Sequence, residues 1–401
     1  MEEWKSYRLG DIVQIGSGLV YKADYLGEGN ALLLGMGCVS FTEKFLNKGA
    51  RPYSGESDER FCVNPGDIVL ATRQQSDNLP ILGMPAIIPE EYRGKRLIAG
   101  SNLYIVHNES EIDNRYLYWL LKTPQYINHI SSCKTGTTVR MITKKDIESF
   151  VFSCPGKEQR KKISDLLWSI EDRIDLNIRI NHNLEKQAYA LFKSWFVDYE
   201  PFKDGEFVDS EVGLIPKGWQ VIRFNEFVQL SNERVQEDST PEYSVTNNGI
   251  FPREVKFNKQ LSSSPLKNKV IRKGNLVFGM SREILNWGIM KEPIGGVSSA
   301  YTVYNVNELI INPIYLELYI KTHTTYFMDL IKPAAREGQG IDKNILASKF
   351  IILPRTDVWR RFLLVFDVLN KELLHKEKEV VELIKYRDEL LPALINGQLS
   401  C

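Results

Sequence analysis

The first half of the chain carries a run of side chains whose chemistry suits the recognition of nucleic-acid bases. Arg73, Gln74 and Gln75 follow an apolar stretch directly, and Asn78 comes shortly after them. Arginine can form two hydrogen bonds with guanine, and asparagine or glutamine can do the same with adenine. The alternative is a solvated loop that binds nothing.

A second polar segment, residues 134–140, has the composition of a phosphate-binding loop. Lys134, Thr137, Thr138 and Arg140 supply side chains of the types that contact phosphates. Gly136 lies among them, and a glycine lets the backbone approach a phosphate closely. An ordinary turn is the alternative, and the sequence favours neither interpretation.

The second half of the chain places similar residues at corresponding positions. Arg282 follows an apolar stretch as Arg73 does, and Arg336 and Gln339 lie in a glycine-containing segment. A solvated loop, or pairing of Arg282 with the neighbouring acid Glu283, is the alternative. Because an arginine follows the apolar stretch in both halves, we favour contact with DNA.

Motifs for catalysis and cofactor binding are weak in this sequence. The segment Asn312-Pro-Ile-Tyr315 is similar to the NPPY motif of adenine methyltransferases, but no glycine-rich cofactor strand precedes it. The five histidines are scattered without metal-ligand spacing, and the nucleotide-binding motif GxxxxGK[ST] does not occur. We therefore expect no catalytic residues, no metal and no cofactor.

The overall charge does not indicate a generally basic nucleic-acid-binding protein. Lysine plus arginine and aspartate plus glutamate both number 51, so any DNA-binding face must be local. The sequence lacks a secretion signal, and no stretch approaches the ~18 to 20 apolar residues of a membrane span. The five cysteines are widely spaced without a CxxC pair, which fits a reducing compartment. We expect a cytoplasmic protein without membrane contact.

The same succession of segments occurs twice along the chain. Residues 4–15 (WKSYRLGDIVQI) are similar to residues 219–230 (WQVIRFNEFVQL), and residues 150–155 (FVFSCP) are similar to residues 350–354 (FIILP). Short strand-like segments with one or two helices in each copy predict a duplicated α+β domain. The expected order is a first α+β domain at 1–155, a helix at 156–197, a linker at 198–214, a second α+β domain at 215–354 and a second helix at 355–401.

Both predicted helices carry apolar residues at alternating intervals of four and three, which is the spacing of a coiled-coil seam. The seam turns polar at the same step in both helices, at Asn177 and at Lys376. A buried polar residue can fix the alignment of two helices, although a position that faces solvent or a partner is an equal alternative. The predicted seam residues are Ile163, Leu167, Ile170, Ile174, Asn177, Leu184, Phe362, Phe366, Leu369, Leu373, Lys376 and Leu383.

The short linker constrains how the two helices can meet. If their seams are to pack together, the second helix must run antiparallel to the first. The expected fold is a tandem duplication of an α+β domain and a long helix, with the helices paired as an antiparallel coiled coil. This arrangement gives a dumbbell with approximate two-fold symmetry, and it brings the two ends of the chain close together.

Four aromatic side chains of the first helix are candidates for binding another protein. Trp168 and Tyr189 lie off the seam, and Phe192 and Phe196 lie near the end of the helix. The alternative for these side chains is burial against a neighbouring domain of the same chain.

Three segments resemble the specificity (S) subunits of type I restriction–modification systems. They are QRKKISDLLWSIEDRIDLN at 159–177, LEKQAYALFKSWFVDYEP at 184–201 and GLIPKGW at 213–219. The resemblance extends over the whole chain and both repeats. The end of the second helix, PALINGQLS at 392–400, departs from the family pattern.

The resemblance implies that each α+β domain is a target recognition domain for one half of a split site in double-stranded DNA. The helices would set the distance between the half-sites and bind methyltransferase subunits, expected to number two, and restriction endonuclease subunits would join through them. Such a subunit has no catalytic activity of its own. The alternatives are a self-contained DNA adenine methyltransferase and a protein–protein scaffold that does not bind DNA.

Overall fold

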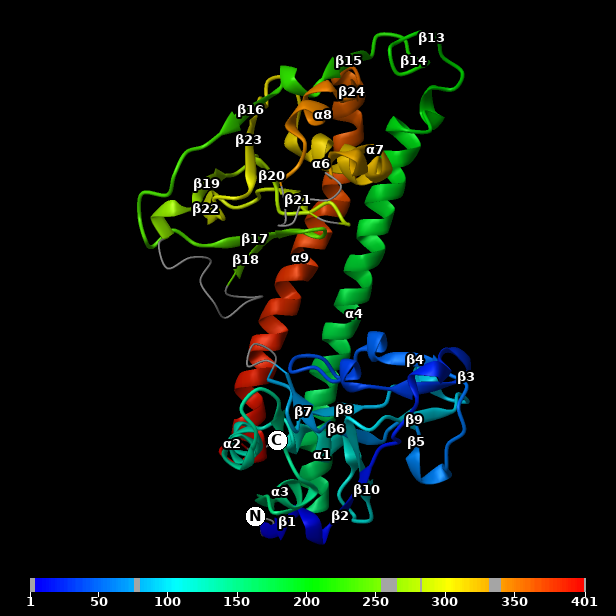
Figure 1. Ribbon diagram of the computed structural model, residues 1–401, viewed down its shortest axis with the longest axis vertical. Helices are drawn as coiled ribbons and strands as arrows, with labels where there is room; N and C mark the ends of the chain where they lie inside the picture. The colour runs from blue at the N-terminus through cyan, green and yellow to red at the C-terminus, as the bar shows by residue number, and fades with distance from the viewer. Residues whose placement is uncertain (1–3, 76–79, 254–264, 282, 332–339, 400–401) are drawn as a thin grey trace. The chain divides into compact units, whose positions relative to one another are not determined.

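The computed structural model describes residues 4–75, 80–253, 265–281, 283–331 and 340–399 (Figure 1). The chain divides into two units. Unit 1 comprises Met1–Arg179 with Lys376–Cys401, and unit 2 comprises Ile180–His375. Each unit therefore contains an α+β domain together with part of helix α4 (Lys157–Phe196) and part of helix α9 (Thr356–Ile395).

The α+β domain of unit 1 contains two four-stranded sheets. The first has the order β2 (Val13–Ser17), β10 (Leu103–Asn108), β6 (Ile68–Ala71) and β8 (Pro85–Ile87), and the second has the order β4 (Ala50–Tyr53), β3 (Leu26–Leu34), β9 (Leu97–Ala99) and β5 (Cys62–Val63). Two further pairs join β1 (Lys5–Arg8) to β12 (Val151–Cys154) and β7 (Arg73–Gln74) to β11 (Arg140–Met141). The helices of this domain are α1 (Asn114–Leu120), α2 (Pro124–Cys133) and α3 (Lys144–Glu148).

The α+β domain of unit 2 contains one four-stranded sheet and several pairs. The sheet has the order β16 (Val228–Ser231), β23 (Thr302–Val306), β20 (Leu276–Phe278) and β21 (Trp287–Ile289). The pairs are β13 (Phe207–Val208) with β14 (Ile215–Pro216), β15 (Gln220–Arg223) with β24 (Phe350–Leu353), β17 (Tyr243–Thr246) with β18 (Gly249–Pro252), and β19 (Lys269–Arg272) with β22 (Ile294–Val297). Its helices are α6 (Pro313–Thr322), α7 (Thr324–Phe327) and α8 (Lys343–Ser348).

The two domains repeat the same antiparallel topology. The sheet β2-β10-β6-β8 of unit 1 corresponds to β16-β23-β20-β21 of unit 2, and the pair β1–β12 corresponds to β15–β24. The segments with similar sequences supply the corresponding strands. The predicted duplication of an α+β domain is therefore confirmed.

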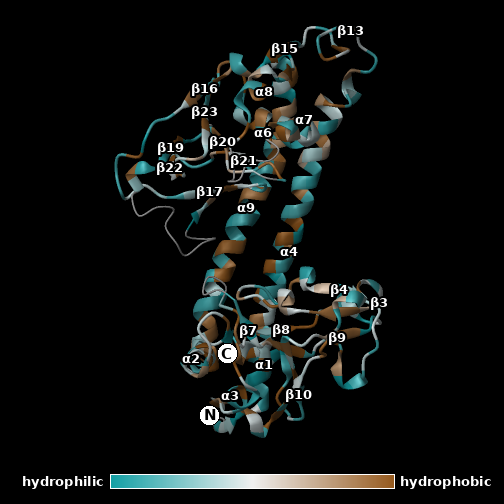
Figure 2. Cartoon of the chain, viewed as in Figure 1, coloured by the Kyte–Doolittle hydropathy of each residue, from teal (hydrophilic) through white to brown (hydrophobic). Residues whose placement is uncertain are grey.

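The central strands are continuous apolar runs because both of their faces are buried. All four residues of β6 are 0% exposed, with Ile68 and Leu70 in one core and Val69 and Ala71 in another. A strand covered on both faces needs no alternation of polar and apolar residues. Figure 2 shows apolar residues in these strands and in α6, whereas both long helices alternate between apolar and polar residues.

The methyltransferase-like segment is the start of helix α6. Asn312 caps this helix, since its Oδ1 accepts a hydrogen bond from the backbone amide of Ile314, and Pro313 occupies the first turn. Asp113 caps α1 in unit 1 in the same way, by accepting a hydrogen bond from the amide of Arg115. Helix capping thus accounts for the similarity to NPPY.

In unit 1, α4 and α9 run antiparallel. Arg173 pairs with Glu379 at 2.7 Å, and Glu171, which precedes Arg173, pairs with Arg387, which follows Glu379. The seam residues Ile163 and Leu167 share an apolar core with the C-terminal turns of α9. Those turns contribute Leu391, Leu394 and Ile395.

In unit 2, the end of α4 packs against the start of α9 through aromatic rings. The ring centroids of Phe196 and Phe362 lie 4.9 Å apart, and those of Phe192 and Phe362 lie 5.9 Å apart. The ring of Trp359, which precedes Phe362, lies 6.0 Å from that of Phe196 in a tilted arrangement. The order of these contacts is again antiparallel, as the sequence predicts.

The predicted seam is buried most deeply toward the start of each helix. Ile163, Leu167, Ile170, Ile174 and Asn177 are 0 to 7% exposed in unit 1, and Phe362 and Phe366 are 0 and 6% exposed in unit 2. The remaining predicted members are half-buried: Leu184, Leu369, Leu373, Lys376 and Leu383.

In unit 1, Lys376, where the seam of α9 turns polar, belongs to a network of charged side chains. Lys376 donates a hydrogen bond to Glu379 at 3.0 Å, and Arg173 donates to the same carboxylate at 2.8 Å. These two hydrogen bonds lower the pKa of Glu379 to about 2. The step therefore links α4 to α9 through charge.

The two ends of the chain lie together within unit 1. Gly397 adopts a φ of +71°, and a Cβ added there would come within 2.5 Å of the Trp4 ring. Glycine is therefore required at this contact both by the backbone conformation and by space.

Candidate nucleic-acid interface

The structure brings the two polar segments of the first half together on one ribbon. Strand β7 pairs with β11 in antiparallel register, so that Gln74 lies opposite Arg140 and Arg73 lies opposite Met141. The sequence predicts the two segments as separate candidates, because they lie far apart along the chain and nothing local shows that they pair. A two-stranded ribbon is one of the two shapes that fit the major groove of DNA.

A tight turn supports the exposed end of this ribbon. Thr135 and Met141 exchange two backbone hydrogen bonds, of 3.0 and 2.9 Å. Between them, Gly136 has a φ of +88°, and a Cβ there would lie 2.2 Å from the carbonyl oxygen of Val139. Arg140 donates a hydrogen bond to the Gly136 carbonyl at 2.5 Å, which closes the turn further.

The side chains around this turn are available to a ligand. Arg73, Gln75, Lys134, Thr137 and Thr138 are exposed, and Arg140 is half-buried. Among the described residues, neither Arg73 nor Lys134 forms an ion pair. Arg73 and Lys134 thus supply local positive charge at the surface, in a chain whose overall charge is zero.

Sequence reasoning missed two apolar members of the ribbon. Met141 is 42% exposed and Val139 is 38% exposed. An apolar residue is normally expected to be buried, so its type alone gives no signal of exposure. Apolar side chains in a major groove can contact the methyl group of thymine.

The prediction for Gln74 needs a correction. Its side chain is 8% exposed, and its Oε1 accepts a hydrogen bond from the backbone amide of Leu82 at 3.3 Å. Successive residues of a strand point to opposite faces, so Arg73 faces outward and Gln74 faces inward. Gln74 therefore stabilises the fold, and the base-recognising role that the sequence suggested for it does not fit its burial.

Tyr104 on β10 contacts the ribbon beside the end of β11. Its hydroxyl donates to the carbonyl of Ile142, the residue after β11, at 3.2 Å. Burial raises the pKa of Tyr104, the carboxylate of Asp146 raises it further, and the positive charge of Arg73 opposes both. The hydroxyl remains protonated at neutral pH and anchors the base of the ribbon.

Four predicted DNA-binding residues lie outside the described parts of the chain: Asn78, Arg282, Arg336 and Gln339. The turn beside Arg282 is held by Asn286, whose amide hydrogen bonds to the Ser281 hydroxyl at 2.8 Å and whose side chain donates to the Met280 carbonyl at 2.6 Å. Ser281 is 6% exposed and so serves the turn itself.

The aromatic residues of α4 also need a correction. Trp168, Phe192 and Phe196 are 7, 0 and 1% exposed, because the cores of this chain cover them. The indole of Trp168 donates to the carbonyl of Arg115 at 3.2 Å. These three side chains fit the alternative of burial within the chain, whereas Tyr189 is 39% exposed and remains available to a partner.

Within the described residues, no group of His, Cys, Asp or Glu side chains could hold a metal ion. Nor does any described helix have the length and apolar character to cross a membrane.

Comparisons with known proteins agree on one family. Residues 1–186 match the model of the type I restriction modification DNA specificity domain. The MjaIX specificity subunit of a type I restriction enzyme from Methanocaldococcus jannaschii is 24% identical over 99% of this chain and 94% of its own length. The HindI specificity subunit from Haemophilus influenzae is 29% identical over 51% of this chain and 43% of its own length.

One solved structure shares the fold. The S subunit of a type I restriction-modification system from M. genitalium aligns with a TM-score of 0.53 and 13% identity, over 98% of this chain and 96% of that one.

Proposed function

Since this chain is a relative of the specificity subunits of type I restriction enzymes, we propose that it selects the DNA sequence for a type I restriction–modification complex. The observation that carries the proposal is the β7–β11 ribbon with its turn, where the exposed cations Arg73 and Lys134 come together with exposed amide and hydroxyl side chains. The chain itself supplies recognition, and the reaction takes place in partner subunits.

The first recognition domain, residues 1–155, contacts one half-site through this ribbon. In this proposal Arg73 and Gln75 contact base edges, and Lys134, Thr137 and Thr138 contact phosphates. Arg140 supports the turn and adds positive charge. Because Val139 and Met141 are exposed beside them, the half-site is expected to include a thymine.

The second recognition domain, residues 215–354, contacts the other half-site through Arg282, Arg336 and Gln339. Its topology repeats that of the first domain, but its side chains differ, so the two half-sites differ as well. The double-stranded site is therefore bipartite and asymmetric.

The long helices set the separation of the two half-sites. Each contains 40 residues, which corresponds to a length of ~60 Å. Within each unit, the parts of the two helices pack together through buried seam residues. The spacer helices proposed at 156–197 and 355–401 also carry the surfaces for two methyltransferase subunits and for the endonuclease subunits. Tyr189 belongs to such a surface.

Co-expression of the chain with its methyltransferase partner tests this function. The assembled complex should methylate adenines within one gapped, asymmetric sequence, which sequencing of methylated bases would reveal. Its DNA affinity should fall steeply with salt, because cations of the chain displace counterions from phosphates.

Two results would contradict the proposal. An affinity that does not change with salt would favour a scaffold without DNA contact. Binding of the methyl donor S-adenosylmethionine by the isolated chain would instead favour a self-contained methyltransferase.

A further inference from the structure

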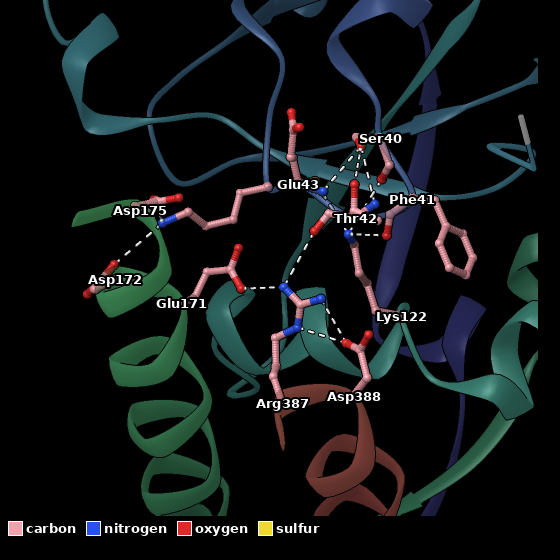
Figure 3. Close-up of polar contacts among 11 residues, drawn as sticks. Ser40, Phe41, Thr42, Glu43, Lys122, Glu171, Asp172, Asp175, Arg387 and Asp388 are labelled. Carbon is pink, nitrogen blue, oxygen red and sulfur yellow. Dashed lines mark hydrogen bonds and ion pairs between the residues drawn. The ribbon is translucent and has the colours of Figure 1, made fainter. Parts of the chain in front are cut away.

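A short loop of the first recognition domain, residues 40–44, contacts both long helices of unit 1 through charged groups (Figure 3). The loop follows the turn at Met36–Cys38 and precedes strand β4. Its carbonyl oxygens accept hydrogen bonds from two cations, and its own lysine binds carboxylates of α4. We refer to this loop with Lys122, Glu171 and Arg387 as the charged joint.

Lys122 holds the loop from the side of the recognition domain. Its ammonium group donates to the carbonyls of Phe41 at 2.9 Å, Glu43 at 3.4 Å and Ser40 at 3.5 Å. It also lies 5.4 Å from the ring centroid of Tyr118. Three carbonyls and an aromatic face surround one ammonium, so the loop is ordered around this charge.

Burial, together with the positive charge of the nearby Arg387, lowers the pKa of Lys122 to about 8. The carboxylates of Glu171, Asp388 and Glu43 act in the opposite direction. The ammonium thus remains charged at neutral pH, although the protein removes it from much of its hydration.

Arg387 holds the same loop from α9. Its guanidinium pairs with Glu171 of α4 at 2.7 Å, and both side chains are almost fully buried, at 7 and 4% exposed. The same guanidinium reaches the carbonyl of Thr42 at 3.5 Å and pairs with Asp388 at 2.7 Å. One arginine therefore connects α4, α9 and the recognition domain.

Lys44 completes the joint from the loop itself. Its ammonium pairs with Asp175 at 2.5 Å and with Asp172 at 3.4 Å, both on α4. It also lies 5.2 Å from the ring centroid of Trp168. The lysine side chain is 19% exposed, so these contacts are partly shielded from water.

The positions of unit 2 that correspond to Arg387 and Glu171 are uncharged. Ala188 stands 199 residues before Arg387, and Asn370 stands 199 residues after Glu171. Lys321, the counterpart of Lys122, is 51% exposed and pairs with Glu317 one turn away on its own helix. Unit 2 instead joins its helices to its domain through rings, among them Phe196 and Tyr315 at 5.4 Å.

We propose that the charged joint positions the first recognition domain on the long helices, with Lys122 and Arg387 as positioning residues for one half-site only. This inference rests on the proposed function. Hydrogen bonds to charged groups are strong and have specific geometry, so they can fix the position of the loop on the helices. Loss of the joint should therefore leave the first domain folded but less accurately placed, and it should leave the second domain unchanged.

The test compares Lys122→Met with the matched variant Lys321→Met, each in the full chain assembled with the methyltransferase partner. The probes are duplexes that carry the mapped site, versions with a one-base-pair change in spacer length, and versions with a substitution in either half-site. The measured quantity is the ratio of methylation rates between the mapped site and each altered site.

Lys122→Met should reduce the ratio for altered spacers, and for substitutions in the first half-site, by about tenfold or more, because a misplacement of ~1 Å can change rates by about a hundredfold. Its ratio for the second half-site should stay at the wild-type value. Lys321→Met should behave as wild type throughout. Lys122→Arg, which keeps the charge and the donors, should recover most of the loss.

Wild-type ratios for Lys122→Met, or equal losses at both half-sites, would overturn the inference. If Lys122→Met does not fold, Lys44→Met provides the test instead, since it removes the contacts of the Lys44 ammonium with Asp172, Asp175 and the Trp168 ring but leaves Lys122 and Arg387 in place. The same half-site-specific loss is expected. Failure of the wild-type complex to methylate any defined sequence is a different outcome, which would overturn the proposed function along with this inference.

Discussion

The buried ion pair between Arg387 and Glu171 gives a prediction about the stability of unit 1. Replacing Arg387 by methionine removes the cation but leaves a carboxylate that is 4% exposed. Among the described residues, no other cation forms an ion pair with Glu171. Breaking a buried pair in this way typically costs ~3 to 5 kcal/mol, mostly because the remaining charge cannot be solvated.

The reciprocal change should cost less. Glu171→Met leaves the arginine paired with Asp388, whose side chain is 59% exposed, and in contact with the Thr42 carbonyl. The loss should then be about 1 to 3 kcal/mol, the range for one hydrogen bond to a charged group together with its desolvation. The double variant should be more stable than Arg387→Met alone, because neither charge is left buried without a partner.

Hydrogen exchange of amides in residues 163–175, read by mass spectrometry, measures the opening free energy where the pair is formed. A local readout is needed because a chain with two units does not unfold in one step. Glu171→Met costing as much as Arg387→Met would refute this reasoning, and so would losses that simply add in the double variant.

Three further predictions concern the ribbon, the helices and the joint. Arg73→Ala should weaken discrimination between DNA sequences at one half-site only, by ~1 to 3 kcal/mol in binding measurements with mismatched duplexes, and equal losses at both half-sites would indicate misfolding instead. Gln74→Ala should lower the Tm, because the buried backbone amide of Leu82 loses its hydrogen-bond acceptor. Removing one heptad at matched positions from both long helices shortens each helix by ~10 Å, so the spacer of the methylated motif should become about three base pairs shorter while the half-sites stay the same. An unchanged spacer would contradict the role of helix length. Folding depresses the pKa of Lys122 from 10.5 to about 8, so between these pH values the folded joint binds fewer protons than the opened joint, and its stability should rise with pH. Amide hydrogen exchange of loop 40–44, corrected for the intrinsic effect of pH, should therefore slow as pH rises from 8 to 10.5. Unchanged or faster exchange would contradict this prediction.

Sequence patterns that extend over many residues predict the fold well. The duplication was visible because both copies keep the order of their segments, and the helices were visible because their apolar spacing persists over many turns. Helix caps were also foreseeable, since Asn312 and Asp113 occupy the same place before α6 and α1. Asn312 shows that a motif resembling a catalytic one can have a purely structural cause.

The candidate site was predicted less completely, for reasons that are specific to its residues. The pairing of β7 with β11 depends on tertiary contacts, so the sequence could not show that Arg73 and Arg140 lie on one ribbon. A strand of two residues is also too short to show which side faces inward, which is why Gln74 was misjudged. Of the four aromatic candidates on α4, Trp168, Phe192 and Phe196 are buried, and their burial depends on the neighbouring domain rather than on the helix itself.

The charged joint was similarly hidden. Arg387 lies four residues after the seam residue Leu383, where a continuation of the spacing predicts an apolar residue, and its partner Glu171 lies 216 residues away in the sequence. Lys122 and Lys44 are ordinary surface residues by type. Only their convergence on one loop distinguishes them.

Mapping of methylated adenines by the complex, for the wild-type chain and for Arg73→Ala side by side, tests the central claim most directly. We expect one gapped motif with two different half-sites for the wild type. For the variant we expect lower sequence specificity in the first half-site and an unchanged second half-site. An ungapped motif, or a variant motif identical to that of the wild type, would contradict it.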